Sequence, residues 1–254
     1  MELRDAIAKK AWDMMLGARE IELTDPLGTD LRFRLTPADW EPDGNAEGGE
    51  DASYRPGHLM LPLPARDLEG ILVTTSITFG GPVPATKLTI EGRQVTRVEG
   101  GGTFGERLRE SFEQYKDQTF PGKPGPGVNW LSTFGICTNP KARPSPSYDK
   151  LAGSAKVHAW SIGHRRSGII HTALGMAMAH PKYKVCRHVD LQFSTLRADG
   201  KLIIDRGHLT SLDDPDVRKF AGKFGNLNQL LVEDWIPSMV HSGLPQFLEN
   251  LNCY

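Results

Sequence analysis

Apolar and polar residues alternate along much of the chain, in short runs typical of β-strands. The clearest case is 20–36, EIELTDPLGTDLRFRLT, in which two alternating runs flank the turn sequence Asp-Pro-Leu-Gly. Similar runs recur at 70–99 and from 185 onwards, with tight turns predicted at 91–93 and 198–200. We therefore expect many short strands, joined to their neighbours by tight turns.

A second pattern, with a period near 3.6, predicts a helix at 2–18. Further helices are expected at about 104–116, at 213–224, where an Asp N-cap precedes a Pro in the first turn, and near 226–236. Residues 37–57 are acidic, Gly-rich and almost free of aliphatic side chains, so they predict a mobile surface loop. The expected fold is α+β: mostly antiparallel, short-stranded sheets, barrel-like or sandwich, with flanking helices.

Composition narrows the class of protein. The 254 residues suit one large domain or two small ones, and a net charge of −1 gives no basic excess for nucleic acid. No apolar run approaches the ~18 residues of a membrane span, and the N-terminus lacks the apolar region of a secretory signal. Three scattered cysteines, Cys137, Cys186 and Cys253, are too few for a disulfide scaffold or a Cys-rich zinc site. We expect a soluble cytoplasmic protein that acts on a small molecule.

Candidate metal ligands lie within 168–207. His188 and Asp190 are two residues apart, so on a strand they point to the same face, while Leu191 and Phe193 enter the core. His171 precedes a run of small residues and can complete a set of two imidazoles and one carboxylate. Such a set leaves coordination positions open for a reactant, which makes these three residues the predicted metal ligands.

Basic residues precede His171. Arg165 and Arg166 are predicted to hold an anionic substrate, and the alternative is that they are solvated or make structural ion pairs. His164 and His158 are candidates for the catalytic base, since imidazole titrates in the required range.

An apolar stretch before these residues ends at Thr138 and Asn139. We treat both as substrate-contacting candidates, although an Asn before a Pro also commonly hydrogen-bonds its own backbone. His58 stands alone at the start of another apolar run, HLMLPLP, where a structural role is the expectation.

Four motifs occur in a fixed order: TDPLGTDLRF at 24–33, FGICTNP at 134–140, HTALG at 171–175 and HVDL at 188–191. Together they resemble the thermophilic-metalloprotease aminopeptidase superfamily, which includes an iron-dependent 2,5-dihydroxypyridine dioxygenase branch. The resemblance covers about 20–205. It implies a domain like the C-terminal metal-binding domain of that family.

The resemblance implies metal ligands at His171, His188 and Asp190. The aminopeptidases also use two glutamates, which would fall near Thr133 and near 166–167, where this chain has no acid. The dioxygenase branch uses one iron with two His and one Asp. Its other histidine precedes the Asn-Pro motif, where WLSTFGI has none, so His171 is expected to take that place.

Three functions follow as hypotheses. The favoured one is a mononuclear non-haem Fe(II) dioxygenase that opens a hydroxylated aromatic or heteroaromatic ring. The alternatives are an aminopeptidase- or amidase-type hydrolase with zinc or another divalent metal, and a degenerate relative without catalysis. The family's N-terminal α/β domain has no counterpart before residue 21, so we expect a single domain over 1–254. Its absence predicts either a more open cleft or a homo-oligomer, such as a dimer, that completes the cleft.

Overall fold

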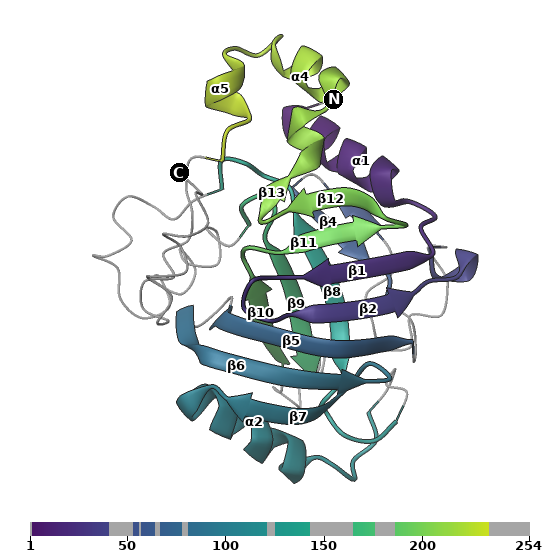
Figure 1. The fold of residues 1–254 in the computed structure, drawn as a ribbon, viewed down its shortest axis with the longest axis vertical. Coiled ribbons are helices and arrows are strands. Elements are labelled where there is room, and N and C mark those ends of the chain that lie inside the picture. Colours follow the sequence, from purple (N-terminus) through teal and green to yellow (C-terminus); the bar gives the residue numbers. More distant parts are fainter. Residues whose placement is uncertain are drawn as a thin grey trace.

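The computed structural model describes residues 2–40, 53–55, 57–63, 67–77, 81–120, 125–142, 165–175 and 186–233. Among them, the side chains of 53–55, 81–82 and 186–187 are not described. The strands form one curled antiparallel sheet with two limbs, which cross steeply in Figure 1. The α+β expectation is confirmed.

The first limb runs β13-β12-β11-β1-β2-β5 and continues from β5 into β6 and β7. Its strands are β1 (Glu20–Thr24), β2 (Asp30–Arg34), β5 (Leu68–Ile77), β6 (Gly81–Glu91), β7 (Gln94–Gly100), β11 (Thr195–Ala198), β12 (Lys201–Asp205) and β13 (His208–Leu209). The predicted hairpin at 20–36 is confirmed, with Leu23 opposite Leu31. The turns at 91–93 and 198–200 also join strands as expected.

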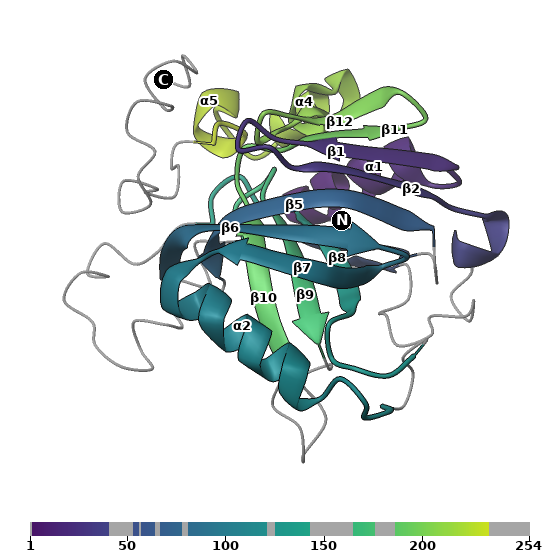
Figure 2. The same ribbon diagram turned by 60° about the horizontal axis from the view of Figure 1, so that its bottom comes forward.

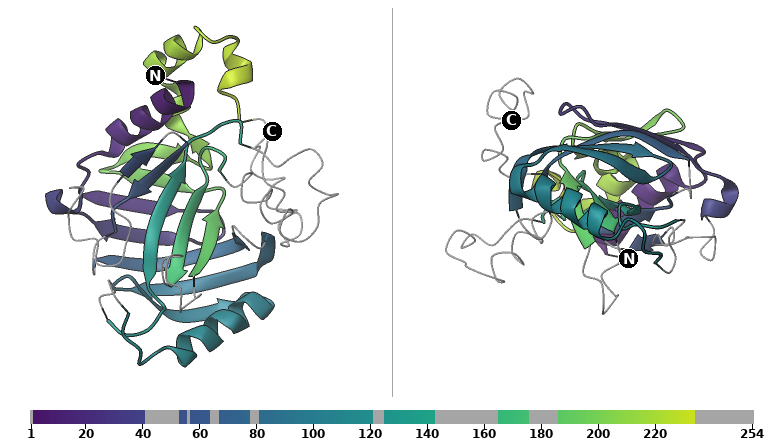
Figure 3. Two further views of the ribbon diagram at one scale, coloured as in Figure 1. Left: turned by 180° about the vertical axis from the view of Figure 1, so that it is seen from behind. Right: turned by 90° about the horizontal axis from the view of Figure 1, so that it is seen from below.

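The second limb runs β10-β9-β8-β4-β3 and lies behind the first in Figure 1. Its strands are β3 (Ser53–Arg55), β4 (His58–Leu61), β8 (Leu131–Cys137), β9 (Ile170–Gly175) and β10 (Cys186–Leu191). It joins the first limb where Val189 of β10 pairs with Ile77 at the end of β5. The view from behind in Figure 3 shows β8, β9 and β10 side by side.

The core fills the space between the limbs. Alternate residues of each strand point inward, because the side chains of a strand alternate between the two faces of its sheet. Phe33 of the first limb meets Phe134 of the second, with ring centroids 5.9 Å apart. On β10 and just beyond it, Leu191 and Phe193 are buried as the sequence pattern predicted.

Helices cover the two ends of the curled sheet. Their bounds are α1 (Leu3–Met15), α2 (Gly102–Gln114), α4 (Pro215–Ala221) and α5 (Leu227–Leu230), with short 3-10 helices η1 (Pro37–Trp40) and η3 (Thr210–Asp213). Figure 2 shows α2 along β6 and β7, while α1 packs beside α4 and η3 at the other end. No helix in the described ranges is both long and apolar enough to cross a membrane.

Local signals explain most of these boundaries. Asp214 caps α4 by accepting from the N–H groups of Asp216 and Val217, and Pro215 opens the helix as predicted. The start of the predicted 37–57 loop is not a loop in the structure, because Pro37–Trp40 forms η1. The indole of Trp40 is buried and donates a hydrogen bond to the carbonyl of Ala18 at 2.9 Å. Most of that predicted loop lies outside the described residues.

Candidate metal centre

Four neighbouring strands place their chemically active side chains on one face. His58 of β4 pairs with Cys137 of β8, and Gly135 pairs with His171 of β9. His171 in turn pairs with Asp190 of β10. Residues directly opposite in an antiparallel ladder point to the same side, so all these positions share one face.

The intervening positions make the other face apolar. They include Leu59, Ile136, Ile170 and Val189, each fully buried. The second limb is therefore apolar toward the first limb and rich in metal-ligating groups on its opposite side. This arrangement follows directly from the two-residue repeat of a strand.

His171 lies between two other imidazoles. Its ring stacks on that of His58 with centroids 4.6 Å apart and 13° between the planes. On the other side, the ring of His188 has its centroid 5.8 Å away, tilted by 44°. Asp190 is the ladder partner of His171, and His188 lies on the same face of β10. The three predicted ligands therefore share one face of two adjacent strands.

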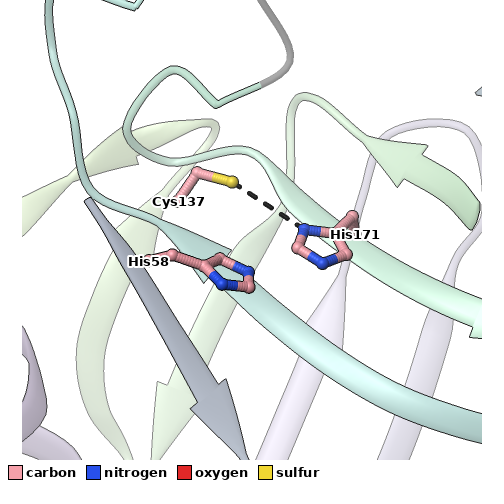
Figure 4. A group of neighbouring side chains, drawn as sticks. All are labelled: His58, Cys137 and His171. Carbon is pink, nitrogen blue, oxygen red and sulfur yellow. Dashed lines mark hydrogen bonds between the residues drawn. The ribbon is translucent and has the colours of Figure 1, made fainter. Parts of the chain in front are cut away.

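The tightest group of donors is not the predicted set. Figure 4 shows His58, Cys137 and His171 converging from three strands. Their donor atoms all lie within 4.8 Å of one another, and Cys137 Sγ is 3.8 Å from His171 Nδ1. Among the described residues, this is the one group of three possible metal ligands whose donor atoms are this close together. The predicted group of His171, His188 and Asp190 is less compact.

Gly135 makes room for the histidines. A Cβ at this position would lie 2.4 Å from His58 Nε2 and 2.4 Å from His171 Cε1, and 2.7 Å from His171 Nε2. Real Cβ atoms essentially never show contacts this close. The absence of a side chain on β8 therefore allows the two rings to approach over the strand.

Burial sets the protonation of this face. It lowers the pKa of His188, against the opposing effect of Asp190 and with a further lowering from Arg165. Burial therefore favours the neutral imidazole, which is the form that binds a metal. Burial also raises the pKa of the Cys137 thiol to about 12, so the thiol keeps its proton unless a cation replaces it.

The two predicted substrate arginines differ. Arg166 is buried, and its Nη1 lies 3.6 Å from Glu233 Oε2. Burial lowers the pKa of Arg166 and Glu233 opposes that shift, so its charge has a partner within the protein. This matches the structural ion pair considered as the alternative, whereas Arg165 is exposed.

The remaining predicted residues lie at the end of β8 or outside the described residues. Asn139 Oδ1 accepts from the backbone N–H of Lys141 at 3.1 Å, which is the local role considered as its alternative. Thr138 is fully buried beside Cys137. His158 and His164 are not among the described residues.

Sequence reasoning missed two residues of this face. His58 was expected to be structural, and Cys137 was considered only as one of three scattered cysteines. Strand pairing, and not sequence spacing, brings them to His171. The available signal was the two-residue repeat of a strand. Cys137 follows the buried Ile136 and His58 precedes the buried Leu59, so each lies on the face opposite to that neighbour.

The comparisons with known proteins concern the fold. No family model and no curated protein matches the sequence. Among solved structures, 2,5-dihydroxypyridine dioxygenase from Pseudomonas putida KT2440 is similar, with a TM-score of 0.56 and 17% identity. The match covers 82% of this chain and 60% of that one, so this chain spans less than two thirds of the neighbour's length. Wild-type AmpT from Thermus thermophilus also matches, with a TM-score of 0.41, 14% identity, and coverage of 78% of this chain and 52% of that one.

Proposed function

We propose that this protein is a mononuclear non-haem iron enzyme that opens a hydroxylated aromatic or heteroaromatic ring with oxygen. The observation that carries the proposal is the placement of His171, His188 and Asp190 on one face of two paired strands. Two imidazoles and a carboxylate with open positions are the ligand set of non-haem iron oxygenases. The similar fold of a 2,5-dihydroxypyridine dioxygenase supports the same class of reaction.

The donor groups fit such an ion. Burial favours a neutral His188, and Asp190, only 2% exposed, supplies a carboxylate where water is scarce. Gly135 lets the ring of His171 lie directly against β8, where a Cβ would be 2.4 Å from its Cε1. Bound iron supplies the redox chemistry that lets oxygen react with the ring.

The chain's own groups would bind and orient the substrate. Arg165 is exposed and close in sequence to His171, so we propose that it binds the negatively charged group of the substrate. Arg166, held in its ion pair with Glu233, would support Arg165 from the neighbouring position. His164 or His158 would take the proton of the substrate hydroxyl. Thr138 and Asn139, which directly follow β8, are proposed to border the substrate.

Oxygen uptake tests the proposal. Full-length protein, reconstituted anaerobically with Fe(II), is mixed with 2,5-dihydroxypyridine or a hydroxylated aromatic acid, and oxygen is followed with an electrode. We expect uptake that requires iron and is abolished in His188→Ala. Iron-loaded protein that takes up no oxygen with any of these compounds would refute the assignment.

A metal-dependent hydrolase remains the second candidate, because the thiolate and imidazoles beside His171 are also zinc ligands. It predicts release of amine from aminoacyl anilides by zinc-loaded protein, unchanged when oxygen is removed. A hydrolase with two metal ions is disfavoured, because two dications need several carboxylates to offset their repulsion. Among the described residues of the paired strands β8, β9 and β10, Asp190 is the single carboxylate.

A further inference from the structure

We propose that His58, Cys137 and His171 form a second cation site, adjoining the His188–Asp190 pair, that takes a zinc-class ion through one thiolate and two imidazoles. This site does not depend on the dioxygenase reaction. It is distinguished from the iron site by its sulfur ligand and by its place across β4, β8 and β9. His171 belongs to both sets, but a neutral imidazole offers one lone pair, so the ring binds one of the two ions at a time.

The separations suit one ion. Sulfur and nitrogen ligands about 2.3 Å and 2.0 Å from a tetrahedral zinc lie roughly 3.5 Å apart. Cys137 Sγ and His171 Nδ1 are 3.8 Å apart, and His58 completes a group whose donors all fall within 4.8 Å. Side-chain shifts of roughly an ångström, together with a rotation of one of the two stacked rings so that both lone pairs point at the ion, bring the three donors to coordination distance.

The donor types select the ion. A thiolate with two imidazoles prefers zinc-class and other soft ions over hard, oxygen-seeking ions such as Mg²⁺. Three protein ligands leave the fourth tetrahedral position for water or a reactant. On binding, the metal–sulfur bond forms as the thiol proton of Cys137 passes to the solvent.

The backbone is adapted to this group. The stacked rings of His58 and His171 meet above Gly135, where a Cβ would contact both at 2.4 Å. Cys137 lies two residues further along β8, on the same face and fully buried. Three ligating side chains from three strands thus surround a position that β8 leaves without a side chain.

Cobalt provides a test specific to sulfur, because thiolate coordination of Co²⁺ gives a charge-transfer absorption in the near ultraviolet. Full-length protein stripped with a chelator is titrated with Co²⁺. We expect the band to saturate at one equivalent and to be bleached when Zn²⁺ displaces the cobalt. The band should be lost in Cys137→Ser and in His58→Gln.

Matched variants separate this site from the proposed iron site. Cys186→Ser should keep the band, because Cys186 pairs with Gly175, four ladder positions from the Asp190–His171 pair. His188→Ala should keep the band while losing iron-dependent oxygen uptake. If that variant loses both, one joint centre exists and the second site is wrong.

Other outcomes also decide the matter. Absence of the band in the wild-type protein, or its persistence in Cys137→Ser, would overturn the proposal. Far-ultraviolet circular dichroism and metal-free thermal unfolding verify that each variant folds. If Cys137→Ser does not fold, His58→Gln, which changes a half-buried residue, decides by the presence or absence of the band. Failure of oxygen uptake alone would leave the sulfur site standing.

Discussion

At the scale of single residues, Gly135 is the position on which the histidine pair most depends. In Gly135→Ala the new methyl would lie 2.4 Å from both His58 Nε2 and His171 Cε1, so one ring has to move. We expect a loss of about 1–3 kcal/mol in the free energy of unfolding, as for overpacked interiors. Bound metal per protein should fall as well. Denaturant unfolding and metal analysis measure the two effects.

Gly222→Ala is the matched control for this substitution. Its Cβ would have its nearest neighbour at 3.5 Å, an ordinary contact, and the backbone at the end of α4 is already helical. The control should be neutral or slightly stabilising, with metal content unchanged. Equal effects of the two substitutions would mean that the space over Gly135 is not special.

His208 is a residue whose charge should stabilise the protein over a defined pH range. Its Nδ1 lies 2.8 Å from Glu233 and its Nε2 lies 2.7 Å from Asp213. The hydrogen bond to Glu233 is the main reason that its pKa rises from 6.5 to about 9, while burial acts in the opposite direction. Because the folded state binds this proton more tightly, the stabilisation is complete below about 6.5 and is lost as pH rises through about 9.

His208→Gln should therefore lower the free energy of unfolding at pH 6 and have little effect at pH 10. Urea unfolding at a series of pH values measures the difference from wild type. Arg197→Gln, on β11, is the control, because guanidinium groups do not titrate in proteins, so its effect on stability should not vary with pH. A His208→Gln effect that is equally large at pH 10 would contradict the assigned charge pairing.

At the scale of elements, the β1–β2 hairpin depends on a single side chain in its turn. Asp25 Oδ1 accepts from the N–H groups of Leu27 at 2.7 Å and Thr29 at 3.0 Å. Asp25→Ala leaves these donors without their acceptor and should cost about 1–3 kcal/mol of unfolding free energy. Asp25→Asn keeps an acceptor at the same place and should cost much less, as chemical denaturation would show. Equal losses would mean that the carboxylate charge, and not the turn hydrogen bonds, matters.

Elements were the level at which the sequence was most informative. Alternation and turn residues predicted the 20–36 hairpin, and the Asp-Pro pair predicted the start of α4. These signals are local, since each depends on residues within a few positions of one another. The start of the 37–57 segment was predicted wrongly. The indole of Trp40 is buried and donates to the carbonyl of Ala18, a distant contact that the polar residues around Trp40 do not reveal.

At the scale of the whole molecule, the candidate centre depends on which strands are neighbours. The His188–Asp190 pair was predictable because both residues lie on one strand. Cys137 and His171 are 34 residues apart, and His58 is more distant still, so only the β4-β8-β9 order brings them together. Nothing in the spacing of a single sequence encodes that order, which explains why the tightest donor group was missed.

The two faces of the second limb should respond differently to mutation, because one face packs in the core and the other carries the donors. Ile136 is fully buried on the core side, next to Gly135 and Cys137 on β8. Ile136→Val should cost about 0.5–1.5 kcal/mol of unfolding free energy without changing the metal bound per folded protein. His171→Gln should abolish metal uptake, since it removes the ring common to both proposed sites. Metal analysis and denaturant unfolding on the same samples test the contrast. If Ile136→Val lost metal while remaining folded, then core packing, and not the donors alone, would hold the centre in place.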